Sequence, residues 1–143
     1  MSRILASLIC LCLAFATQAH AATAADLIGS WSVDADATWD KMKAQPQFAA
    51  AKPEQITQMK AMFGSMGYEI TKDKMISTMA SQKKEETYTV SKGEGDSLVT
   101  ESTDAAGKKE KSKVEFLKDG SLLLTNLDNP AQMMVLKKAV AKK

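Results

Sequence analysis

The stretch LIGSWSVD, residues 27–34, has the alternation of a half-buried β-strand. In an extended chain, Ser30 and Ser32 fall on one side of this stretch. The other side carries Leu27, Gly29, Trp31 and Val33. The stretch therefore predicts a first strand with one face in a core.

The pattern changes directly after this strand. The segment DATWDKMKA, residues 36–44, has Trp39 and Met42 three positions apart, which is typical of a short helix. Asp34 or Asp36 is suited to cap it, and Asp36 is the expected cap. Pro46 disfavours helical geometry in the residue before it, so the helix should end there. Counted as an EF-hand loop from Asp34, this segment lacks the required glycine and glutamate, so calcium is not expected.

A second helix is expected to begin near Pro53, a residue suited to the first helical turn. Gly67 is suited to stop it. The apolar positions follow a helical period, with glutamines and a lysine on the opposite face. They are Ile56, Met59, Met62, Phe63 and Met66.

From Tyr68 onward, short segments with a period of two alternate with turn-forming residues such as GEGD, KDG and DNP. With the first strand they make eight expected strands. The other seven cover residues 68–72, 75–80, 85–92, 97–103, 111–118, 121–127 and 132–139. The charged segments QKKEE (82–86) and KKEKSK (108–113) are interpreted as solvated strand faces.

Eight strands joined by hairpins would leave two unpaired edges in an open sheet, and closure into a barrel removes both. The fold class predicted is therefore mainly β: a single antiparallel up-and-down barrel of about eight strands, with two short helices between strands 1 and 2. Those helices would cross one mouth of the barrel. Such a barrel is wide enough for its own side chains or for one small ligand.

Gly29-Ser30-Trp31 on the first strand resembles the G-x-W signature of the lipocalin and fatty-acid-binding (calycin) superfamily. The order of that strand, two helices and a meander is similar to lipid-binding barrels and to small exported lipocalin-like proteins of bacteria. The resemblance implies that Trp31 packs the closed end of a barrel. It also implies a basic residue against that tryptophan, for which Lys137 and Lys138 are available.

The first residues are typical of a signal peptide. Arg3 precedes an apolar run of 13 residues, 4–16, which is too short to span a membrane. Ala19 and Ala21 form an A-x-A cleavage pattern. We therefore expect residues 1–21 to be a signal peptide and residues 22–143 to be one lipocalin-like barrel domain without a transmembrane anchor. The protein is expected to be exported, to the periplasm if the source is Gram-negative.

Cleavage there would remove every Cys, His and Arg of the chain. The mature chain of about 122 residues would then have no disulfide, no Cys or His nucleophile chemistry and no zinc site built from Cys and His. Its carboxylates, serines and lysines form no recognisable catalytic motif. The net charge falls from +2 to +1, so nucleic acid is not an expected partner. We predict a protein that is not an enzyme and has no cofactor.

The methionines of the second helix allow three interpretations. They are packed core, a lid over an apolar ligand, or a soft site for copper(I). Core packing is favoured because Ile56 and Phe63 share the same face.

The leading hypothesis is non-enzymatic binding of a small apolar or amphiphilic ligand, with the helices gating the barrel mouth. Met59, Met62, Phe63 and Met66 would then line the gate, and Tyr88, Phe116 and Leu124 would line the cavity. The alternative is a filled barrel that binds an envelope protein partner, as an interaction or inhibitor module, through its outer surface. A cavity of about 300 Å³ or more favours the carrier, and a dense interior favours the alternative. The sequence does not indicate an oligomeric state.

Overall fold

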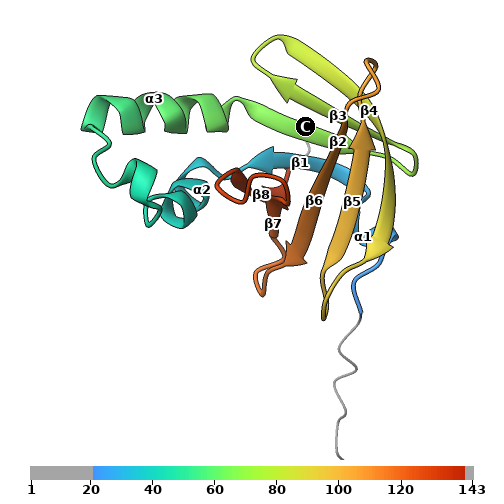
Figure 1. Cartoon of the computed structure of the whole chain (residues 1–143). Coiled ribbons are helices and arrows are strands. Elements are labelled where there is room, and N and C mark those ends of the chain that lie inside the picture. The colour runs from blue at the N-terminus through green and yellow to red at the C-terminus, as the bar shows by residue number, and fades with distance from the viewer. Residues whose placement is uncertain (1–20, 141–143) are drawn as a thin grey trace, which may run out of the picture.

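An eight-stranded antiparallel barrel forms most of the structure (Figure 1). The computed structural model describes residues 21–140, so the predicted signal peptide lies almost wholly outside the described residues. Each strand pairs with its neighbours in sequence, and β8 pairs with β1 to close the sheet. The predicted fold class is confirmed. The strands are β1 (Gly29–Val33), β2 (Met66–Ile70), β3 (Lys74–Met79), β4 (Gln82–Lys92), β5 (Leu98–Thr103), β6 (Lys109–Phe116), β7 (Leu122–Asn126) and β8 (Met133–Lys138).

Two helices and a short 3-10 turn lie between β1 and β2, where the helix pair was predicted. They are α2 (Ala35–Met42), η1 (Pro46–Phe48) and α3 (Pro53–Gly64), and a four-residue helix α1 (Ala24–Leu27) precedes β1. Figure 1 shows α2 and α3 on one side of the barrel and α1 on the other. Across residues 21–140, no helix has the length and apolar character needed to cross a membrane.

The beginning of the fold differs from the sequence prediction in two details. Leu27 belongs to α1 rather than to the first strand, and its carbonyl accepts a hydrogen bond of 2.8 Å from Trp31 Nε1. Asp34, not Asp36, caps α2, because its Oδ1 accepts from the backbone N–H of Ala37 at 3.0 Å. Helix α2 therefore begins at Ala35, earlier than its apolar spacing indicates.

The end of α3 also differs from the prediction. The helix stops at Gly64, and the Ser65 N–H donates to the carbonyls of Ala61 and Met62. Met66 is therefore the first residue of β2, where it pairs with Met79 of β3. The expected helical stripe of three methionines is reduced to Met59 and Met62.

The G-x-W segment closes the end of the barrel away from α2 and α3. Lys138 Nζ lies 4.1 Å from the centre of the Trp31 ring and donates to the Ile28 carbonyl at 3.1 Å. Gly29 has a φ of +138°, and a Cβ there would lie 2.9 Å from Lys138 Nζ. A glycine is needed at this position because other residues rarely adopt that φ. The basic residue that the resemblance implied is thus Lys138.

The barrel interior is mostly filled by its own side chains. Trp31, Val114, Leu122 and Leu136 are almost fully buried in one apolar cluster. The void among the apolar interior residues, which include Leu124, has a volume of only about 10 Å³. That is about the space of a single water molecule at most, so the apolar half of the barrel is a packed core.

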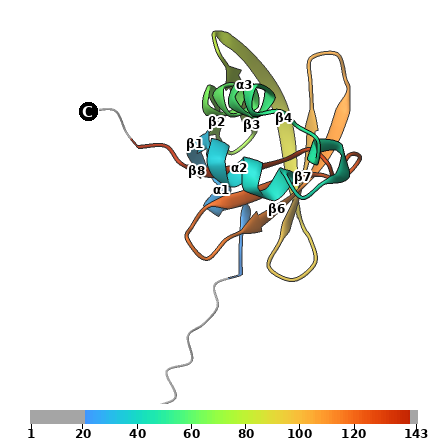
Figure 2. The same ribbon diagram turned by 90° about the vertical axis from the view of Figure 1, so that its left-hand side faces the viewer.

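Helix α2 is fixed to the wall of the barrel beside β8. Thr38 is 0% exposed, and its Oγ1 accepts a 2.9 Å hydrogen bond from the Val135 N–H. Lys137 Nζ lies 3.4 Å from the Asp34 carboxylate. Helix α3 packs on α2 and β1, and Figure 2 shows α3 above α2. These contacts support the surface on which the first candidate site is built.

Candidate binding sites at the helices and the barrel mouth

An open depression with a volume of about 570 Å³ lies between η1 and α3. We call it the helix groove. Its walls combine aromatic, aliphatic and thioether side chains with neutral amides and carry no charged residue. It is lined by Gln47, Phe48, Ala50, Ala51, Gln55, Gln58, Met59 and Met62.

Local sequence fixes both walls of the helix groove. Phe48 packs edge-on against Trp39 of α2, with ring centres 5.9 Å apart. Pro53 occupies the first turn of α3, and the Gln55 side chain accepts a 2.9 Å hydrogen bond from the Lys52 N–H just before it. This hydrogen bond satisfies one of the free N–H groups at the start of a helix. The groove is therefore held by helix capping and by one aromatic contact.

The residues predicted to form a gate are only partly brought together. Met59 and Met62 both line the helix groove, and Met62 is 45% exposed. Phe63 is buried in the core instead, and Met66 is part of β2 and half-buried against the core. Two of the four residues thus share an open surface, and the other two contribute packing.

A second, smaller depression lies inside the barrel at the end where the chain leaves β1 for the helices. We call it the mouth pocket, and its volume is about 130 Å³. Its polar groups come from β2, from β4 to β7 and from the turn before β8, and apolar side chains form its floor. It is lined by Tyr68, Met75, Glu86, Ser102, Glu110, Ser112, Leu124, Asn126, Gln132 and Met134.

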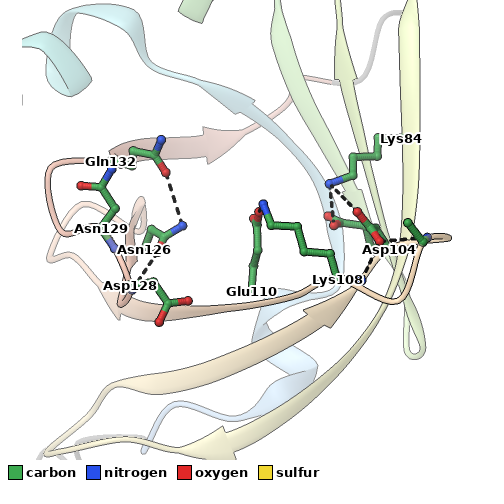
Figure 3. Close-up of polar contacts among 10 residues, drawn as sticks. Lys84, Asp104, Lys108, Glu110, Asn126, Asp128, Asn129 and Gln132 are labelled. Atoms are coloured by element: carbon green, nitrogen blue, oxygen red, sulfur yellow. Dashed lines mark hydrogen bonds and ion pairs between the residues drawn. The ribbon is translucent and has the colours of Figure 1, made fainter.

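Ion pairs surround the mouth pocket. Lys84 Nζ lies 2.9 Å from the Glu86 carboxylate and 3.8 Å from Asp104, and Lys108 Nζ lies 2.7 Å from Glu110. Figure 3 shows Lys108 and Glu110 between the Lys84 and Asp104 side chains on one side and the Asn126 and Gln132 amides on the other. The Asp104 carboxylate is held in place because it accepts hydrogen bonds from the backbone N–H groups of Ala106 and Lys108, each at 2.9 Å.

The hydrogen bond from Lys84 to Glu86 raises the pKa of that lysine, and the bond from Lys108 lowers the pKa of Glu110. Burial, followed by the charges of Glu86 and Glu110, raises the pKa of Tyr68 to about 12. The phenol of Tyr68 therefore stays neutral at neutral pH. The phenol O–H points to a weak acceptor, the Met134 sulfur, at 3.6 Å.

The residues predicted to line a cavity do not share one. Tyr88 is buried, and its hydroxyl donates to the Thr71 carbonyl at 2.6 Å near the closed end. Phe116 lines a different surface depression, beside Trp31 and Lys138. Leu124 lies between the apolar core and the mouth pocket. All three face inward, but at different levels of the barrel.

Sequence reasoning did not identify the polar lining of the mouth pocket. Glu86 is only 9% exposed, although its segment was interpreted as a solvated strand face. A usable signal was present: Glu86 is two residues before Tyr88, and strand residues two apart share a face. Glu110 and Ser112 likewise share the face of Val114 on β6. Only the outward half of these charged segments is solvated.

Within residues 21–140, no group of three or more His, Cys, Asp or Glu side chains is arranged to hold a metal ion. The chain was compared with protein-family models, with curated proteins and with solved structures, and it matches none of them. Functional inference therefore depends on the two sites themselves.

Proposed function

We propose that this protein is a non-enzymatic binding protein for a small amphiphilic molecule, held in the helix groove rather than inside the barrel. The observation that carries this proposal is a difference in volume. The helix groove offers about 570 Å³, within the range of small-molecule sites, whereas the apolar interior leaves about 10 Å³. A lipid-sized ligand would have to displace core side chains to enter the barrel.

The lining of the helix groove indicates the chemistry of the ligand. Phe48, Met59 and Met62 offer an apolar surface, and flexible methionines adapt to alkyl chains of different shape. The polar lining consists of the amides of Gln47, Gln55 and Gln58, which form hydrogen bonds without carrying charge. The groove therefore suits an alkyl chain with an uncharged polar head.

The proposal includes the cellular location and the family relationship. The signal-peptide pattern supports export of the mature protein, to the periplasm if the source is Gram-negative. The G-x-W strand, with Lys138 against Trp31 in a closed eight-stranded barrel, supports a relationship to the lipocalin-like proteins. In this account the barrel is a stable scaffold for the helices.

The proposal is tested by titrating the mature protein with an apolar fluorescent probe and then displacing the probe with a short-chain alkyl glucoside. Met62→Lys places a charge in the helix groove and should abolish both the binding of the probe and its displacement by the glucoside. Met79→Lys is the matched control, because Met79 is 43% exposed and lies outside the groove. Equal binding by wild type, Met62→Lys and Met79→Lys would refute the groove as the site.

A second function is favoured by the same filled interior. The helix groove could receive an apolar side chain of an envelope protein rather than a free small molecule. In that case the Met62→Lys variant would lose the protein partner, while the wild-type protein would bind neither the fluorescent probe nor the glucoside.

A further inference from the structure

The mouth pocket is a site that the proposed function does not use. It lies in the interior of the barrel, at one end, whereas the helix groove lies between η1 and α3. The two sites share no lining residue. Polar cavities inside a small barrel are costly unless their polar groups are paired. A polar group in the lining that has no partner within the protein would therefore indicate that the pocket binds a ligand.

The pocket is lined by two serines whose hydroxyls form no hydrogen bond with another described residue, and Ser102 is the more buried of the two. The residue is 9% exposed, lines the mouth pocket, and lies opposite Glu110 in the β5–β6 register. The Ser102 hydroxyl forms no hydrogen bond with any other residue within 21–140. No fully enclosed side-chain N or O atom of the described residues lacks a partner, so the Ser102 oxygen must be open to the pocket. It is positioned to bind an occupant.

The charges around the pocket favour a cation. Glu86, Asp104 and Glu110 face the paired lysines, Lys84 and Lys108, which leaves one net negative charge at the mouth. Lys84 is shared between Glu86 and Asp104, while Glu86 and Glu110 both line the pocket. One bound monovalent cation would neutralise the site.

The size and floor of the pocket favour a small organic cation over a metal ion. A volume of about 130 Å³ corresponds to roughly four water molecules at about 30 Å³ each. Met75, Leu124 and Met134 provide an apolar surface for a short alkyl group. A primary ammonium has three N–H donors, and it meets acceptors at the two glutamates and at the free serine oxygen.

We infer that the mouth pocket binds a small primary ammonium compound, with its charged group between Glu86, Glu110 and Ser102 and its alkyl part on Met75, Leu124 and Met134. The amides of Asn126 and Gln132 line the outer side of the same pocket. This site is independent of the helix groove, so either proposal can fail without the other.

The test uses the mature protein, labelled with ¹⁵N, and n-propylammonium as the probe. In NMR spectra at neutral pH, the backbone amide chemical shifts around Ser102 and Glu110 are expected to change with added probe until they saturate. 1-Propanol and propionate have similar size but lack the positive charge, and they should give no saturable shift. Equal binding of propanol, or shifts that rise without saturation, would overturn the inference.

Variants locate the probe within the pocket. Glu86→Gln keeps shape and polarity but removes one charge, and it should weaken propylammonium binding by about tenfold or more. Ser102→Ala removes the free acceptor and should weaken binding without altering the ion pairs. Glu101→Gln is the matched control on the outer face of β5, where Glu101 pairs with Lys109 and Lys111, and it should leave the affinity unchanged.

Folding is verified for each variant by circular dichroism and urea unfolding, so that loss of structure is not mistaken for loss of binding. A folded Glu86→Gln or Ser102→Ala variant that binds propylammonium like the wild type would contradict the site. A Glu101→Gln variant that loses binding would place the probe on the outer surface and overturn it as well.

Discussion

At the scale of single residues, Gly29 is the position at which the backbone requires one amino acid. Its φ of +138° is unfavourable for any residue with a Cβ. Gly29→Ala should therefore lower the free energy of unfolding by about 1–3 kcal/mol, measured by urea denaturation. Gly64→Ala is the control, since no atom lies within 4 Å of the added Cβ at the end of α3. That variant should be neutral or slightly more stable, and equal losses in both would contradict the role of φ.

Thr38 is the residue through which α2 is attached to the barrel. Thr38→Val keeps the shape but leaves the buried N–H of Val135 without its acceptor, which should cost about 1–3 kcal/mol. Thr57→Val in α3 is matched, because Thr57 is exposed and bonds only to Pro53 of its own helix. Its unfolding free energy should change by less than about 0.5 kcal/mol. A neutral Thr38→Val variant would show that this hydrogen bond does not hold α2.

At the scale of elements, the cap of α2 should make stability depend on pH. The hydrogen bond from Ala37, aided by Lys137, lowers the pKa of Asp34 below its ordinary value of 3.8. Because the folded pKa is depressed, the stabilisation is present above the unfolded pKa and is lost as pH falls through the folded value. Asn also caps helices, so Asp34→Asn should be less stable than wild type at neutral pH, and this difference should shrink below about pH 4.

Urea unfolding at a series of pH values measures this difference. Asp34→Ala removes the cap itself and should cost about 1 kcal/mol even where the carboxylate is protonated. A difference between wild type and Asp34→Asn that stays constant down to acid pH would show that the charge of Asp34 does not contribute.

The strands and helices also show which parts of the fold can be predicted from the sequence alone. The period of two after Tyr68 identified all seven later strands, because each has one face in the core. The end of α3 was misplaced because Met66 fits both the helical stripe and the inward face of β2. Apolar spacing cannot distinguish these two roles, and the backbone bonds of Ser65 decide between them.

At the scale of the whole molecule, barrel closure was predictable from the strand count, but the distribution of internal space was not. The volume left inside depends on how Trp31, Leu122 and Leu136 interlock across strands that are distant in sequence. The helix groove depends on a similar long-range contact, the packing of Phe48 on Trp39. Met59 and Met62 were therefore identified as candidates, while the groove they share was not.

The central claim is that an amphiphile binds outside the filled barrel, and methionine methyl groups report on it directly. The mature chain, labelled with ¹³C at its methionine methyls, would be titrated with an alkyl glucoside below its micelle concentration and followed by NMR. The account predicts saturable shifts at Met59 and Met62, with Met75 and Met134 inside the barrel unchanged. Shifts at Met75 and Met134 with none at Met59 and Met62 would place the ligand inside the barrel and contradict the account.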